Sequence, residues 1–162
     1  MPHFATTLLR TRNDWTLTLA RLVLFAIFIG HGSQKMFGWF GGPGYPAILD
    51  IFQDTMGIPP PLTILVMITE VGSALLLLLG LAGRLAALGL LVVMIVAPFA
   101  NGLYPQFFMN WQGNFPHEGF EYHLLAIALL VGILVRGSGA LSLDRLLQSY
   151  GPPAPAPQDR WA

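Results

Sequence analysis

Apolar residues along this chain gather in four long runs, and their lengths predict a helical membrane protein. A helix that crosses the hydrocarbon core needs about 20 apolar residues, with a range of about 17–25. The four candidate runs cover residues 15–32, 62–82, 85–104 and 120–135. The predicted fold is therefore all-α, an integral membrane four-helix antiparallel bundle.

The segments between the runs differ in kind. Only Gly83 and Arg84 separate the second run from the third, and so short a connection predicts an antiparallel hairpin. The linkers 32–61 and 104–119 are long and rich in Gly, Pro and aromatic residues. Within the first linker, residues 47–56 place their apolar side chains on one face, which predicts a short amphipathic helix.

Composition agrees with a membrane protein and excludes several other classes. The 162 residues are 54% hydrophobic and 10% charged, whereas an average soluble domain is about 25% charged. The net charge is zero, which argues against a nucleic-acid partner. Because Cys is absent, disulfides and thiolate metal sites are excluded. We expect an N-terminal segment (1–14), one membrane domain (15–145) and a Pro/Ala-rich disordered tail (146–162).

The distribution of cations predicts the orientation in the membrane. The first run lacks a small-residue cleavage site, so we expect a retained anchor rather than a signal peptide. Lys35 is the cation of the two long linkers, and the other segments that flank the runs carry Arg10, Arg12, Arg84, Arg136 and Arg145. By the positive-inside rule, both termini are predicted to be cytoplasmic in a bacterial inner membrane, with the long linkers on the periplasmic side.

Ionisable residues inside the apolar runs are the first functional candidates, because lipid tolerates them only when they pair or line a polar cavity. Arg21 lies in the first run and Glu70 in the second. Arg21 and Lys35 are four helical turns apart and share a face, so Glu70 can pair with either cation. Three interpretations stay open: a structural Arg21–Glu70 pair, a proton or ligand site at Glu70, and an Arg21 that extends to the headgroups.

A second group of polar residues lies at the predicted periplasmic level. His31 and Lys35 are one turn apart, and Glu121 and His123 open the fourth run. These side chains either converge on a polar pocket or form an ordinary interfacial belt. A metal site that also used His117 is disfavoured because no dense ligand spacing is present, so no metal is predicted.

Aromatic residues flank that polar group and are candidates for the wall of a flat-ring binding site. They are Phe37, Trp39, Trp111 and Tyr122. Interfacial loops carry such residues for membrane contact as well, so both interpretations stand.

The motif His31-Gly32-Ser33-Gln34-Lys35-Met36-Phe37-Gly38 resembles the first-helix signature of the DoxX family of small four-helix membrane proteins. The segments 83–84, 119–124 and 139–144 and the region around Glu70 resemble later elements of that family. The resemblance implies that the buried polar residues form the site and that quinone is the associated cofactor class. It also implies a link to a membrane oxidoreductase system.

Two functions from different classes are therefore predicted, and the sequence leaves open whether the protein is an enzyme. The first is an accessory or quinone-linked component of a membrane oxidoreductase, with no cofactor held by the chain alone. The second is a non-enzymatic accessory subunit, or a small-molecule-binding protein that docks on a larger membrane complex. The expected partners are the lipid bilayer and other membrane subunits or further copies of the chain.

Overall fold

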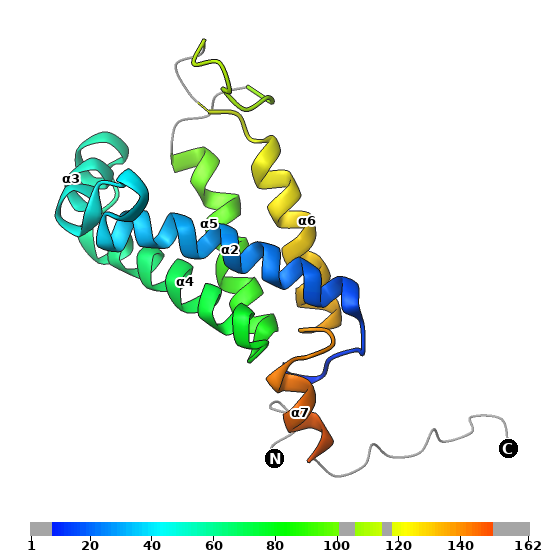
Figure 1. The fold of residues 1–162 in the computed structure, drawn as a ribbon. Helices are drawn as coiled ribbons and strands as arrows, with labels where there is room; N and C mark the ends of the chain where they lie inside the picture. The colour runs from blue at the N-terminus through cyan, green and yellow to red at the C-terminus, as the bar shows by residue number, and fades with distance from the viewer. Residues whose placement is uncertain (1–7, 101–105, 115–117, 151–162) are drawn as a thin grey trace, which may run out of the picture.

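The computed structural model describes residues 8–100, 106–114 and 118–150, and every regular element in these ranges is a helix (Figure 1). The α-helices are α2 (Trp15–Phe37), α3 (Gly44–Met56), α4 (Pro60–Leu79), α5 (Gly83–Ala100), α6 (Glu121–Arg136) and α7 (Leu143–Ser149). A 3-10 turn, η1 (Trp39–Gly41), joins α2 to α3. The predicted all-α class is confirmed, and the amphipathic helix predicted at 47–56 is α3, which begins earlier than expected.

Three helices, α2, α4 and α5, are long and apolar enough to cross a membrane. They correspond to the first three predicted runs, although α2 continues past residue 32 to Phe37 and the end of the third run lies outside the described residues. The fourth run forms α6, which has 16 residues and a length of about 24 Å at 1.5 Å per residue. Because the hydrocarbon core is about 30 Å thick, the structure does not establish α6 as a fourth span.

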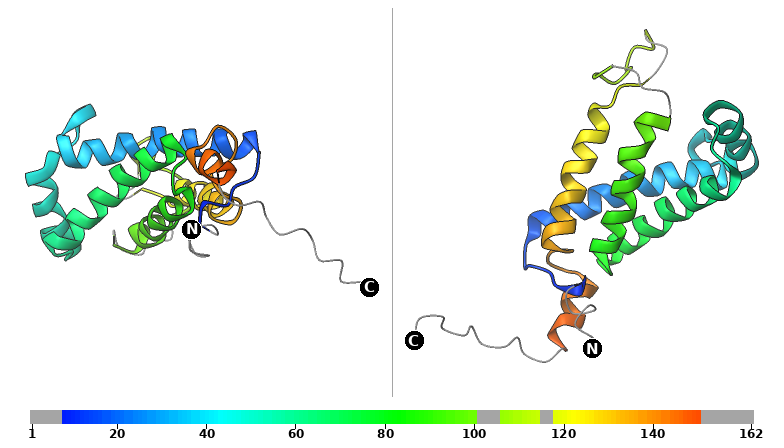
Figure 2. Two further views of the ribbon diagram at one scale, coloured as in Figure 1. Left: turned by 90° about the horizontal axis from the view of Figure 1, so that it is seen from below. Right: turned by 180° about the vertical axis from the view of Figure 1, so that it is seen from behind.

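The four longer helices form two antiparallel pairs that cross each other (Figures 1 and 2). One pair is α2 with α4, and the other is α5 with α6. The pairs meet near α7 and diverge toward α3 at one end and the 106–114 segment at the other. The architecture is thus less parallel than the regular bundle predicted from the sequence, and the divergence opens space between the pairs.

The helix ends follow from local capping. Asp14 precedes α2 and accepts hydrogen bonds from the backbone N–H of Thr16 at 2.8 Å and from its hydroxyl at 2.6 Å. These bonds hold the pKa of Asp14 below its ordinary value. At the end of α4, Gly80 adopts φ +63°, a conformation that side chains disfavour. A Cβ at Gly80 would lie 2.5 Å from the Cβ of Ser142, so this turn requires glycine for space as well.

The core lies where the two pairs meet. Its fully buried members come from all four longer helices, and several are alanines that let the helices approach closely. They are Leu24, Phe28, Ala74, Leu77, Ala86, Ala87, Leu90, Met94, Ala126, Leu130 and Ile133. This packing fixes the relative position of the pairs and therefore the shape of the space beyond it.

Helix α7 fastens the turn between α4 and α5. The buried carboxylate of Asp144 accepts hydrogen bonds from the backbone N–H of Ala82 at 2.7 Å and of Gly83 at 3.1 Å. It also accepts a bond from the Ser138 hydroxyl at 2.6 Å. Asp144 thereby satisfies free N–H groups at the start of α5, where a negative charge is favourable.

The predicted boundary of the membrane domain at residue 145 falls inside α7 (Leu143–Ser149). Residues 146–149 are therefore helical and do not belong to a disordered tail, because Ser142 caps the helix and Asp144 anchors it. The rest of the predicted tail, 151–162, lies outside the described residues, as does the start of the N-terminal segment, 1–7.

Candidate functional site

A pocket of about 420 Å³ lies between the two helix pairs, on the side where they diverge. Its wall is mainly apolar, with contributions from α2, α3, α4, α5 and α6. The apolar lining residues include Phe28, Phe52, Met56, Val66, Val93, Met94 and Ala97. The polar lining residues are His31, Lys35, Glu70, Glu118, Tyr122 and His123. A mostly apolar cavity of this size with a few polar groups is typical of small-molecule sites, which measure about 300–1,000 Å³.

The central polar feature of the pocket is an ion pair between α2 and α4. The Nζ of Lys35 donates to Oε1 of Glu70 at 2.5 Å. Only 2% of Glu70 is exposed, whereas the Lys35 side chain is partly exposed. The contact exists because α2 extends to Phe37 and carries Lys35 alongside α4. The pair keeps two charges in an apolar setting without a net charge.

A second polar group faces the pocket from α2 and α6. The rings of His31 and Tyr122 lie with centroids 6.1 Å apart, and those of Tyr122 and His123 with centroids 5.4 Å apart. Tyr122 and His123 lie in the first turn of α6, so this helix brings both rings to the pocket. The polar groups of the pocket thus come from both helix pairs.

Three of these polar residues have a buried atom without a hydrogen-bond partner in the described part of the chain. The atoms are Glu70 Oε2, Tyr122 Oη and His123 Nδ1. Buried polar groups in folded proteins are nearly always paired, and each unpaired one costs about 1–3 kcal/mol. Their gathering around one apolar pocket indicates a site built to bind a molecule that offers hydrogen bonds.

Arg21 belongs to a different part of the molecule, and the predicted Arg21–Glu70 pair does not form. Its guanidinium donates to the carbonyls of Leu77 at 2.7 Å, Leu78 at 2.6 Å and Leu141 at 2.6 Å. Leu77 and Leu78 lie in the last turn of α4, two turns beyond Glu70, where helix carbonyls lack partners. Arg21 is 3% exposed, so it neither extends to the headgroups nor lines the pocket.

Glu121, another predicted site residue, also has a structural role. Its Oε1 accepts the backbone N–H of Met109 at 3.1 Å, and its own N–H donates to the carbonyl of Phe107 at 3.0 Å. These bonds hold the 106–114 segment against the start of α6. Glu121 is therefore beside the pocket but is not among the residues that line it.

The four residues of the predicted aromatic wall lie in different places. Tyr122 lines the pocket, whereas Phe37, Trp39 and Trp111 do not. Trp39 is 58% exposed and Trp111 is 87% exposed. The rings of Phe37 and Trp39 instead lie against each other with centroids 5.2 Å apart. Trp39 lies in η1 and Trp111 in the 106–114 segment, and both segments lie outside the helix pairs (Figure 1).

No group of three or more His, Cys, Asp or Glu side chains with metal-binding spacing occurs among the described residues. His117, considered with His31 and His123 as a ligand, lies outside them.

The sequence did not reveal the contribution of α3 to the pocket. Phe52 and Met56 form part of the wall, although both lie in the linker before the second run. The amphipathic pattern of 47–56 was the available signal, since it requires a partner for the apolar face.

The family profile described as DoxX matches residues 16–102, more than half of the chain. The chain belongs to the DoxX family. The matched residues of this DoxX member include His31, Lys35 and Glu70, whereas Tyr122 and His123 lie beyond them. No curated protein and no solved structure matches the chain.

Proposed function

We propose that this DoxX-family membrane protein binds a small, largely apolar molecule with a hydrogen-bonding ring or headgroup, and that quinones are the class it takes. The observation that carries the proposal is the set of unpaired buried atoms, Glu70 Oε2, Tyr122 Oη and His123 Nδ1, around an apolar pocket. A quinone fits this pattern because its ring and tail are apolar and its two oxygens accept hydrogen bonds, while its reduced form, the quinol, offers hydroxyl protons to Glu70 Oε2. A bound quinone would supply the capacity to carry electrons and protons.

The polar residues of the pocket have distinct roles in this proposal. Tyr122 and Lys35 are donors for ligand oxygens from the two helix pairs. Glu70 Oε2 is the acceptor for a ligand hydroxyl proton, and its other oxygen stays with Lys35. The neighbouring apolar side chains exclude water, which strengthens these hydrogen bonds. In this role the protein is an accessory or quinone-linked component of a membrane oxidoreductase, because no residue of the chain is itself an evident electron carrier.

The proposed setting is a bacterial inner membrane, with α6 as a short fourth span and both termini in the cytoplasm. The apolar surfaces of α2, α4 and α5 support the membrane location. The arginines near the chain ends and the α4–α5 turn support the orientation. An antiparallel α6 then completes an even number of crossings.

A second function rests on a different observation. Large aromatic side chains at the α3 end and in the 106–114 segment are exposed, namely Phe37, Trp39, Phe40, Phe108 and Trp111. An accessory subunit without catalysis would use such residues to contact a larger membrane complex or a further copy of the chain. Chemical crosslinking in native membranes tests this version, since recovery of the chain alone would contradict it.

The pocket proposal is tested with Tyr122→Phe, which removes one hydroxyl and leaves the ring. We expect the affinity of purified protein in nanodiscs for a short-chain benzoquinone or naphthoquinone to fall about three- to tenfold, the loss of one hydrogen bond. Because the hydroxyl has no protein partner within the described residues, the thermal stability of the ligand-free protein should stay unchanged or rise slightly. Equilibrium dialysis and thermal unfolding give the two readouts.

The matched control is Tyr45→Phe, since Tyr45 is an exposed tyrosine of α3 that does not line the pocket. Its quinone affinity should equal that of the unmodified chain. An equal loss in both variants, or no binding of either quinone, would overturn the proposal.

A further inference from the structure

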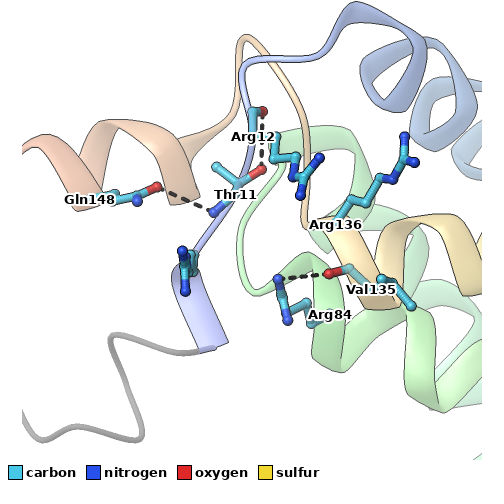
Figure 3. A pocket seen from close by; sticks show the side chains of 7 residues that line it. Thr11, Arg12, Arg84, Val135, Arg136 and Gln148 are labelled. Atoms are coloured by element: carbon cyan, nitrogen blue, oxygen red, sulfur yellow. Dashed lines mark hydrogen bonds between the residues drawn. The ribbon is translucent and has the colours of Figure 1, made fainter. Parts of the chain in front are cut away.

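A second pocket, lined mostly by polar residues, lies at the opposite end of the molecule from the first, where α5 begins and α6 ends (Figure 3). Its volume is about 570 Å³. The lining residues are Arg10, Thr11, Arg12, Arg84, Val135, Arg136 and Gln148. The arginines come from three separate segments, the N-terminal segment, α5 and α6, and lie around one hollow in Figure 3. The chain folds four of its eight cations into one place.

The charges of this arginine pocket are not neutralised within the described part of the chain. None of its arginines forms a salt bridge there. Asp14 acts on Arg136 electrostatically, but its carboxylate accepts the hydrogen bonds of Thr16. Arg84 donates to the carbonyl of Val135 at 3.0 Å, and its Nε is buried without a partner. Clustered positive charges repel each other, so the pocket favours the binding of an anion.

Neighbouring contacts shape the hollow. The backbone N–H of Thr11 donates to Oε1 of Gln148 at 3.2 Å, which ties the N-terminal segment to α7. The backbone N–H of Arg12 donates to the carbonyl of Arg136 at 3.3 Å, which ties the same segment to the end of α6. The first contact fixes the backbone of Thr11 and the second that of Arg12. Within the described residues, neither the Arg12 nor the Arg136 side chain forms a hydrogen bond that it would have to give up to a ligand.

We propose that the arginine pocket binds a phosphate group at the level of the lipid headgroups. Planar guanidinium groups match phosphate oxygens with paired hydrogen bonds. The pocket lies at the ends of helices that are long and apolar enough to span a membrane, which is where headgroup phosphates occur. The N-terminus of α5 does not compete for the same anion, because Asp144 already caps it.

The test compares Arg136→Gln with Arg145→Gln in the full chain in detergent. Arg145 is an exposed arginine near the same end that bonds the side chain of Asn13 and does not line the pocket. The probe is dioctanoyl phosphatidylglycerol, measured by native mass spectrometry against dioctanoyl phosphatidylcholine. We expect a preference for the anionic lipid, and about a tenfold loss of its affinity in Arg136→Gln, the value of one charge-assisted hydrogen bond. Arg145→Gln should stay within about twofold, since Arg145 does not line the pocket.

A second arm distinguishes the source of the phosphate. If inorganic phosphate at millimolar concentration does not displace the lipid, the site takes a headgroup. If inorganic phosphate displaces it with the same dependence on Arg136, the site takes a soluble phosphate compound, and the proposal still holds. Arg12→Gln also removes one pocket charge and should reproduce the loss of affinity. It provides a second test of the proposal if Arg136→Gln does not fold.

The proposal is overturned if Arg136→Gln and Arg12→Gln bind the anionic lipid as tightly as the unmodified chain. It is also overturned if Arg145→Gln loses as much affinity. Equal binding of the two lipids would overturn it as well, because the pocket arginines should repel the choline cation that accompanies the phosphate of phosphatidylcholine. Quinone binding is unaffected in all of these outcomes, because the two pockets share no lining residue.

Discussion

At the scale of single residues, two cations of α2 bind different kinds of partner. They are Arg21 and Lys35. Both lie on the face of α2 that packs on α4, as their spacing predicts. Lys35 finds a carboxylate, whereas Arg21 satisfies three carbonyls at the end of α4 and in the segment before α7. The forked guanidinium serves carbonyls from two elements at once, with Nη1 on α4 and Nη2 on Leu141.

Replacement of Arg21 by Met should therefore destabilise the protein. The variant keeps an apolar chain of similar length but removes the charged donor of three carbonyl groups, which costs about 1.5–3 kcal/mol. Reversible unfolding in detergent measures the change. Arg21→Lys is the matched variant, and it should recover part of the loss because an ammonium group reaches fewer of the three oxygens. Full stability in Arg21→Met would contradict the assigned capping role.

At the scale of elements, the contact between α2 and α4 depends on how closely the helices approach. A Cβ placed on Gly32 would lie 2.7 Å from a methyl carbon of Val71 and 3.3 Å from its backbone nitrogen. Gly32 thus permits the approach that brings Lys35 to Glu70. Gly30, two residues earlier on the opposite face of the same helix, has nothing within 4 Å of its Cβ position.

The two glycines provide a direct comparison. Gly32→Ala should lower stability by about 1–3 kcal/mol through overpacking. Gly30→Ala should be neutral or stabilising by up to about 1 kcal/mol, since alanine is the better helix former. Thermal unfolding of both variants measures the two changes in stability. Equal effects of the two changes would show that the α2–α4 contact is not tight at Gly32.

For the whole molecule, the order of apolar runs was sufficient to predict the helices but not their arrangement. The periodicity and length of the runs predicted α2, α4, α5 and α6 within a few residues. The crossing of the two pairs depends on small residues such as Ala86, Ala87 and Ala126 and on the Asp144 contact to the α4–α5 turn. Neither feature leaves a periodic signal in the sequence.

The site was predictable to the same extent. Of the polar residues predicted at one level, His31, Lys35 and His123 line one pocket, and the deeper Glu70 joins them, whereas Glu121 does not line it. The choice of Lys35 over Arg21 as the partner of Glu70 could not be predicted, since it depends on the extension of α2 to Phe37. Tyr122 is less exposed than the other aromatic candidates. The exposed fraction of a side chain can be known only from the fold.

The proposed orientation of the whole molecule can be tested by cysteine labelling, which is clean because the chain contains no Cys. Trp39→Cys and Trp111→Cys place thiols at exposed positions of the two long linkers, and Ser149→Cys places one in α7. In intact bacterial cells, a membrane-impermeant thiol reagent should label the first two variants. Ser149→Cys should react only after the inner membrane is permeabilised, and its labelling in intact cells would contradict the orientation.

The pairing of Lys35 with Glu70 has a consequence for the exchange of a bound molecule between the pocket and the lipid bilayer. Because the two opposite charges cancel where a guest would sit, a neutral molecule can enter or leave without carrying a counterion with it. An electric field acts on net charge that moves. Exchange of such a guest with the bilayer should therefore proceed equally well in energised and in de-energised cells.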